Sequence, residues 1–128
     1  MKKVSVLFLC LLLCSGVTFA QKKAEAEFKK TEHDFGRINE EVGSVTTQFE
    51  FTNKGDNPLI IHRVSSSCGC TTPSYSKEPI LPGKSGSISA KYSTTGRPGS
   101  FKKSIRVYTN VPDTVYVLTI MGSVLPKK

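Results

Sequence analysis

The chain of 128 residues contains no tryptophan, only two histidines, and ten acidic residues against eighteen basic ones. No window shows a sustained apolar period of 3.6 residues, so no amphipathic helix is predicted. No apolar run reaches the roughly 20 residues that a membrane-spanning helix needs. No Ser-His-Asp order stands out, the Gly-x-Ser-x-Gly pattern of esterases does not occur, and Glu40-Glu41 reads as a solvated turn rather than a catalytic dyad. We therefore expect a protein that is not an enzyme and carries no cofactor.

The first 20 residues have the composition of a secretory signal. Two lysines follow the initial methionine, residues 4–13 form a short apolar core, and Thr18 and Ala20 place small residues where a signal peptidase reads. We expect cleavage after Ala20 and an exported protein, periplasmic or associated with the cell envelope. A lipoprotein signal with Cys14 as the acylated residue is an alternative, but the preceding Leu13 is bulky where a small residue is expected.

Period-2 alternation of apolar and polar residues dominates the rest of the chain. It is clearest over residues 45–53, where Val45, Thr47, Phe49 and Phe51 point to one side. Further short strands are expected at residues 32–36, 59–64, 87–93, 101–109 and 114–124. A bulge is expected near His62-Arg63, because Val64 breaks the alternation there. Residues 21–30 are expected to form a flexible tether, residues 73–77 a loop, and residues 78–86 a kinked edge segment.

About seven short strands at regular spacing, with no helix between them, predict an all-β fold. We expect residues 31–128 to form an immunoglobulin-like antiparallel β-sandwich of about seven strands, with a small closed barrel as the alternative. Without tryptophan or a widely spaced cysteine pair in the exported part, the inter-sheet disulfide of antibody domains is absent. The two sheets must therefore be held together by apolar packing.

Cys68-Gly69-Cys70 is the one place where reactive side chains crowd together. Residues i and i+2 of an extended chain lie about 6.5–7 Å apart, at the limit for a disulfide, and a bend at Gly69 would shorten this distance. Three interpretations stay open: an oxidised local staple or a pair of packed thiols, a soft-metal site for Cu(I) or Zn(II) with His62 or a partner's ligand, and disulfide exchange with a partner. His62 is only a weak candidate ligand, and His33 is expected to be an ordinary strand residue.

Several motifs occur in a characteristic order along the chain. They are His33-Asp34-Phe35-Gly36, Phe49-x-Phe51-x-Asn53-x-Gly55, Pro58-Leu59-x-Ile61, Ser67-Cys68-Gly69-Cys70-Thr71, Ile80-x-Pro82-Gly83, Gly99-x-Phe101, Lys103-x-Ile105-x-Val107-x-x-Asn110 and Leu118-x-Ile120-x-Gly122. In this order the chain resembles the bacterial domain-of-unknown-function family 1573. The resemblance implies an exported immunoglobulin-like domain related to major-sperm-protein and abnormal-spindle-type modules. It implies no reaction.

Two functional hypotheses follow. The first is an exported, non-catalytic module that binds a protein or an envelope component through a sheet edge or its end loops. The second is a thiol-based metal-binding or redox protein that acts through Cys68 and Cys70. The basic residues, which include Lys102, Lys103 and Arg106, suit a solubilising surface or contact with acidic lipids, glycans or a partner protein. Nucleic acid is not expected as a partner, and no transmembrane span is expected in the exported chain.

Overall fold

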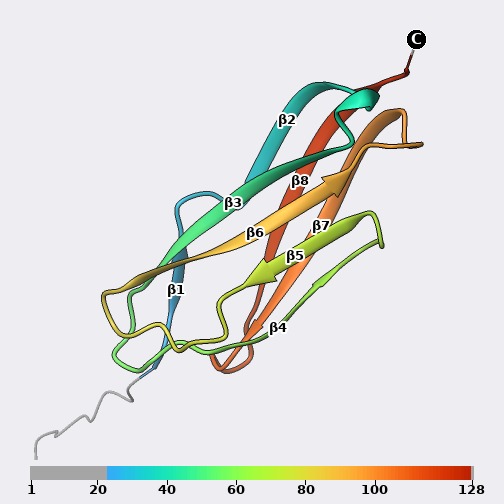
Figure 1. The fold of residues 1–128 in the computed structure, drawn as a ribbon. Helices are drawn as coiled ribbons and strands as arrows, with labels where there is room; N and C mark the ends of the chain where they lie inside the picture. The colour runs from blue at the N-terminus through green and yellow to red at the C-terminus, as the bar shows by residue number, and fades with distance from the viewer. Residues whose placement is uncertain (1–22, 128) are drawn as a thin grey trace, which may run out of the picture.

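The structure is a computed structural model that describes residues 23–127, so the predicted signal in residues 1–20 lies outside it. Its strands are β1 (Ala26–Phe28), β2 (Glu32–Asn39), β3 (Ser44–Asn53), β4 (Ile61–Ser66), β5 (Thr71–Tyr75), β6 (Ser85–Ser93), β7 (Gly99–Thr109) and β8 (Val115–Leu125), and a short 3₁₀ turn, η1 (Glu40–Val42), joins β2 to β3. The strands form two sheets, β1-β3-β6-β5 and β2-β8-β7-β4, which face each other across the core (Figure 1). The predicted all-β sandwich is confirmed, with eight strands in the part of the chain described.

The order of the strands is that of an immunoglobulin-type sandwich. In the constant type, strands A, B, E and D form one sheet and C, F and G the other. Here β1, β3, β6 and β5 correspond to the first sheet, and β4, β7 and β8 to the second, with β2 added beside β8. The β2–β8 pair is parallel, whereas the other strand pairs of the two sheets are antiparallel, as predicted. Alternation predicts which face of a strand is buried, but not the direction of its neighbour.

The expected tether at residues 21–30 is also corrected. Ala26–Phe28 form β1, which pairs with β3, and both Ala24 and Ala26 are buried. The carbonyl of Lys23 accepts a hydrogen bond from the amide of Asp56 at 2.7 Å. The folded domain therefore begins before residue 31, because this segment docks on the turn that follows β3.

Two further strands differ from the expectation. β2 does not end at Gly36 but continues to Asn39, because Gly36 adopts a φ of +71° and the register against β8 shifts between Asp34 and Arg37. Residues 71–75, whose second half was expected to be a loop, form β5 and pair with β6. Pro73 is tolerated there because β5 is an edge strand, where proline need not donate to a neighbour on its free side.

The core lies between the sheets and consists of the side chains that alternation directs inward. The fully buried large side chains include Phe49, Phe51, Leu59, Ile88, Ile105, Val107, Leu118, Ile120 and Val124. Aromatic contacts join the layers: the rings of Tyr92 in β6 and Phe101 in β7 stack at 3.8 Å, and Phe28 contacts both Phe51 and Tyr116. These contacts link the two sheets by apolar packing.

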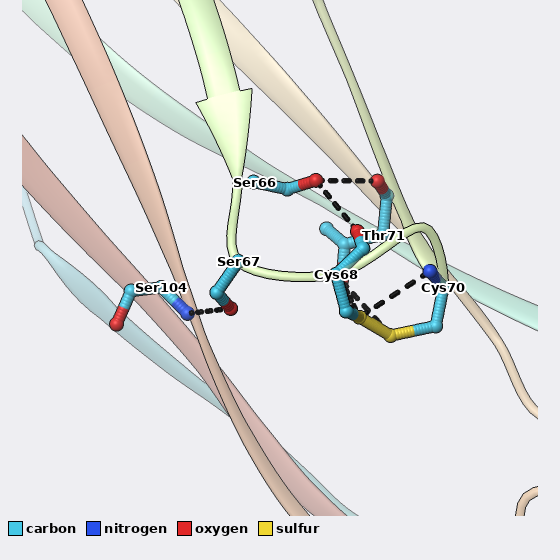
Figure 2. The surroundings of a disulfide bond; sticks show 6 residues. All are labelled: Ser66, Ser67, Cys68, Cys70, Thr71 and Ser104. Atoms are coloured by element: carbon cyan, nitrogen blue, oxygen red, sulfur yellow. Dashed lines mark hydrogen bonds between the residues drawn. A yellow bond between two sulfur atoms is a disulfide. The ribbon is translucent and has the colours of Figure 1, made fainter.

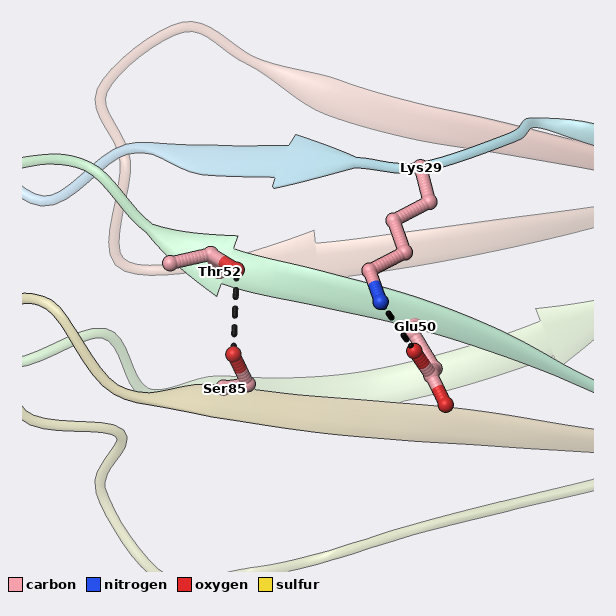
Figure 3. A network of polar contacts seen from close by, with 4 residues as sticks. All are labelled: Lys29, Glu50, Thr52 and Ser85. Atoms are coloured by element: carbon pink, nitrogen blue, oxygen red, sulfur yellow. Dashed lines mark hydrogen bonds and ion pairs between the residues drawn. The ribbon is translucent and has the colours of Figure 1, made fainter.

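Polar pairs on the outer face of the first sheet connect neighbouring strands (Figure 3). Lys29, just after β1, forms an ion pair of 2.8 Å with Glu50 of β3, and the hydroxyls of Thr52 and Ser85 lie 3.0 Å apart between β3 and β6. The hydrogen bond to Glu50 raises the pKa of Lys29, and the same bond lowers the pKa of Glu50. Both side chains are largely exposed, so water and salt screen the pair and its effect on stability is small.

Candidate functional site

The cysteine turn, residues 67–70, is where the chain crosses from one sheet to the other. It joins β4 of the second sheet to β5 of the first. The amide of Ser67 donates to the carbonyl of Ser104 at 3.0 Å, and the amide of Ser104 donates back to the Ser67 hydroxyl at 3.2 Å (Figure 2). At the other end, the amide of Ser93 in β6 donates to the carbonyl of Cys70 at 2.9 Å. The turn is therefore fastened to both layers of the sandwich.

The sulfur atoms of Cys68 and Cys70 lie in direct contact, in the arrangement of a disulfide (Figure 2). The two Cα atoms are 5.3 Å apart, within the range that a disulfide accepts. Gly69 does not adopt the left-handed conformation, and a Cβ built on it meets nothing within 4 Å. The expected bend at Gly69 is present and shortens the distance between the Cα atoms, although it needs no positive φ. The amide of Thr71 reaches the carbonyl of Cys68 at 3.4 Å, which is the closure of an ordinary β-turn.

The two cysteines differ in accessibility and in their contacts. Cys70 is only 4% exposed, whereas Cys68 is half-buried. The amide of Cys70 donates to the sulfur of Cys68 at 3.3 Å, and the Thr71 hydroxyl lies 3.9 Å from each sulfur. The Ser66 hydroxyl bonds to the carbonyls of Cys68 and Thr71 at 2.7 and 3.0 Å. Cys68 is thus the more accessible sulfur, and a donor is already directed at it.

The weak candidate metal set of Cys68, Cys70 and His62 is not brought together. His62 lies four residues before the last residue of β4, which is about 13 Å along an extended strand. His62 is exposed, and its carbonyl accepts a bond from the Tyr75 hydroxyl at 3.5 Å. Among residues 23–127, no group of three or more histidine, cysteine, aspartate or glutamate side chains could hold a metal ion.

The predicted bulge in β4 is confirmed and orders the outer face of the second sheet. The register against β7 shifts between Ile61 and Arg63. Arg63 then pairs with Tyr108, and its guanidinium carbon lies 4.2 Å from the centre of the Tyr108 ring. This distance is typical of a cation–π contact.

Beside this contact and next to the cysteine turn lies a hollow of about 390 Å³, which we call the serine hollow. It is lined by Ser65, Ser66, Ser67, Ser104, Arg106 and Tyr108. A hydrogen bond from Arg106 lowers the pKa of Tyr108, and the charges of Arg63 and Arg106 and a bond from Ser65 act in the same direction, against a smaller rise from burial. The sequence alone did not predict this cluster. The cluster forms because the register of β4 against β7 places residues about 40 positions apart in the sequence side by side.

A larger groove of about 590 Å³, the β5-end groove, lies where β5 stops. The last β5–β6 pair is Tyr75 with Ile88, whereas β6 begins at Ser85, so residues 85–87 have no strand beside them on that side. Its lining includes Tyr75, Pro79, Leu81 and Ser87, and Leu81 is 54% exposed. The groove combines an open stretch of sheet edge with an apolar rim.

Within residues 23–127, no helix is long and apolar enough to cross a membrane. No match was found among curated proteins. Among solved structures, a protein of unknown function from Porphyromonas gingivalis W83 is similar to this chain, with 18% identity and a TM-score of 0.68 over 84% of this chain and 50% of that one. The secreted serine protease VesC of Vibrio cholerae matches with 13% identity and a TM-score of 0.56, over 81% of this chain and 23% of that one. A family 123 glycoside hydrolase from Clostridium perfringens matches with 12% identity and a TM-score of 0.59, over 82% and 27%.

This chain thus spans half, or about a quarter, of the length of these similar proteins. At such identities the likeness concerns the fold alone. A family model described as "Protein of unknown function (DUF1573)" matches residues 26–124, which is most of the chain and begins at the first residue of β1. The chain therefore belongs to the DUF1573 family.

Proposed function

We propose that this chain is an exported, non-catalytic binding module that holds a protein or an envelope component at the edge of the β1-β3-β6-β5 sheet. The observation that carries the proposal is the β5-end groove, where β5 ends before β6 does. An extended segment entering this groove would continue the line of β5 and pair with residues 85–87 of β6. The exposed side chain of Leu81 would contact its apolar residues.

The other sheet edges are less suited to strand addition. β1 has only three residues, and β2 and β4 each contain a register shift. β5 itself carries Pro73 in its middle. Short strands, bulges and proline are the features by which native proteins discourage pairing at an exposed edge. The stretch of β6 beyond β5 is also only three residues long, residues 85–87, but it carries neither a bulge nor a proline and continues a strand that is paired with β3 on its other side.

The similar structures agree with a role as a module. The fold occupies only 23% of a protein described as a secreted serine protease and 27% of one described as a glycoside hydrolase. A fold that recurs as a minor part of larger chains is the pattern expected of an accessory unit. Export of this chain is part of the proposal and rests on the signal-like composition of residues 1–20.

Site-specific photocrosslinking in the producing cells tests the proposal. A photoreactive residue replaces Leu81 at the rim of the groove, and in a matched control it replaces Val42, which is similarly exposed at 57%. We expect a discrete crosslinked product from the cell envelope at position 81 and none at position 42. A Leu81→Asp variant that remains folded should no longer co-purify with the partner. Absence of a product at position 81, or the same products at both positions, would refute binding at this edge.

A second candidate function is thiol chemistry, favoured by the amide of Cys70 that points at the sulfur of Cys68. This donor would stabilise a thiolate on Cys68 in the reduced pair. The thiolate would attack a partner's disulfide and release one partner sulfur as a thiolate. Cys70 would then displace the partner from Cys68, so that two electrons pass to the partner. Metal binding would need further ligands from a partner.

The thiol function is tested with the Cys68→Ser, Cys70→Ser double variant. We expect the native chain, once reduced, to reduce a small disulfide substrate and the double variant to be inert. Metal analysis of both proteins after incubation with Cu(I) or Zn(II) tests the metal alternative in the same preparation. Equal activity and equal metal content in the two proteins would exclude both forms of this candidate.

A further inference from the structure

We infer that the serine hollow on the outer face of the β2-β8-β7-β4 sheet is a binding site for a tetrahedral oxyanion, a phosphate or sulfate group. This inference concerns a different surface from the β5-end groove and stands independently of the proposed function. It rests on the arrangement of hydrogen-bond donors, on the lack of acidic groups around them, and on the shape of the hollow.

Three successive cross-strand rungs build the site. Ser67 faces Ser104, Ser65 faces Arg106, and Arg63 faces Tyr108. Side chains at alternate positions of a strand share one face, so the members of these rungs point to the same side of the sheet. The rungs are about 6.7 Å apart along the strands. An anion with three or more oxygens can therefore accept bonds from neighbouring rungs and from both strands.

Apart from Ser66, whose hydroxyl already donates to two carbonyls, the groups in and beside the hollow are donors that still have hydrogens to give. The Ser67 hydroxyl oxygen accepts from the amide of Ser104, which leaves its own hydrogen free for a ligand. The hydroxyl of Tyr108 lines the hollow together with Arg106 and Ser65. A guanidinium has five N–H donors in a plane, and neither the stacking of Arg63 on Tyr108 nor the interaction of Arg106 with Tyr108 uses all of them.

Among residues 23–127, no carboxylate neutralises these cations. None lines the hollow, and in the part of the chain that the structure describes neither Arg63 nor Arg106 forms an ion pair. The carboxylate nearest by register is Glu32 of β2, which faces Thr119 of β8. Two strand spacings, about 10 Å, separate it from Ser104 of β7. Two unpaired guanidinium groups beside a set of hydroxyls favour an anion, because each bond to it is charge-assisted.

The same geometry disfavours an uncharged sugar or a nucleobase. Both classes of ligand usually stack on an aromatic ring. The face of Tyr108, the single aromatic residue of the hollow, is covered by the guanidinium of Arg63 at 4.2 Å. The hydrogen-bond donors around the hollow stay accessible. They favour a charged ligand with several oxygen atoms over a ligand with a flat ring.

Titration of the exported chain, residues 21–128, with inorganic phosphate and with sulfate tests the site by NMR. We expect saturable shifts of the amides of Ser65, Ser67, Ser104 and Arg106. Arg106→Gln should weaken binding about tenfold or more, as expected when a hydrogen bond to a charged group is lost. Lys102→Gln is the matched control, since Lys102 is exposed on the same face of β7 four residues away and should leave the affinity unchanged. Both substitutions are at exposed positions, and an unchanged amide spectrum away from the site verifies the fold.

Vesicles of phosphatidylglycerol and of phosphatidylcholine distinguish the source of the anion. Binding to the former alone, weakened by Arg106→Gln and not by Lys102→Gln, would identify a lipid headgroup. Binding of the free anions with no vesicle binding would identify a soluble phosphate or a sulfated molecule. The inference is overturned if neither anion produces saturable shifts, or if Lys102→Gln weakens binding as much as Arg106→Gln does.

Discussion

Asn53 is a buried polar residue that joins three parts of the chain. Its side-chain oxygen accepts from the amides of Glu25 at 3.3 Å and Gly55 at 2.9 Å. Its side-chain amide donates to the carbonyls of Asn57 at 2.7 Å and Ile80 at 2.9 Å. Both ends of the carboxamide are therefore used, as is usual for a fully buried polar group. The sequence motif that contains Asn53 thus has a structural meaning.

Replacement of this carboxamide by a carboxylate should destabilise the domain. In Asn53→Asp the two donated bonds are lost, and a buried acid faces the carbonyl oxygens of Asn57 and Ile80. We expect the free energy of unfolding to fall by at least about 2 kcal/mol at pH 7. Urea denaturation measures this loss, with Lys54→Gln at the exposed neighbouring position as the control. An Asn53→Asp variant as stable as this control would show that these bonds do not matter.

His33 makes stability depend on pH in one direction. Partial burial is the main cause that lowers its pKa below 6.5, the charge of Lys30 adds to it, and Asp34 opposes it. Lys30 also donates to the Nδ1 atom of His33 at 2.8 Å, a bond that needs this nitrogen unprotonated. The unfolded chain therefore takes up a proton on His33 at a higher pH than the folded protein does. The stability that neutral His33 contributes is fully present above pH 6.5 and is lost as the pH falls through the lower pKa of the folded state.

His33→Gln should therefore reduce the loss of stability between pH 7.5 and pH 5. Chemical denaturation at the two pH values gives the difference for each protein. His62→Gln, which removes an imidazole from an exposed position, is the matched control. An unchanged pH dependence in His33→Gln would mean that other groups account for the slope.

The segment before β1, residues 23–25, packs directly against the backbone of Gly55. A Cβ on Gly55 would overlap the carbonyl oxygen of Lys23. Gly55→Ala should therefore displace residues 23–25, break the bonds from the amides of Asp56 and Lys54, and cost about 1–3 kcal/mol. Hydrogen exchange at these two amides reports the displacement. Gly69→Ala, where a Cβ meets nothing, should be neutral, and equal effects of the two substitutions would contradict this packing.

Removal of the disulfide in the cysteine turn should affect only the structure close to the turn. A disulfide that closes a loop of three residues stabilises by only about 1.5 kcal/mol in the chain-entropy model. We expect the Cys68→Ser, Cys70→Ser variant to lose about that much and to fold normally. Amide exchange should accelerate at Thr71, Ser93 and Ser104, whose amides bond within or next to the turn. Faster exchange throughout the β7–β8 ladder would show instead that the turn controls the whole sheet.

For the molecule as a whole, alternation in the sequence predicted the buried faces of most strands, because it directly records which side chains leave water. It missed β1, since three residues are too short to show a period, and β5, since Pro73 suggested a loop. The proximity of the two sulfurs could be predicted because it is local. The serine hollow could not, because it depends on the register between β4 and β7, which a single sequence does not reveal.

The most direct test is the intact mass of the protein purified from the producing cells, measured before and after reduction and alkylation. We predict a chain that begins at Gln21 and is two hydrogens lighter than its dithiol form. We expect no alkylation without reductant and two alkylated cysteines after reduction. A chain that retains residues 1–20, a lipid attached at Cys14, or two thiols that react without reduction would contradict this prediction.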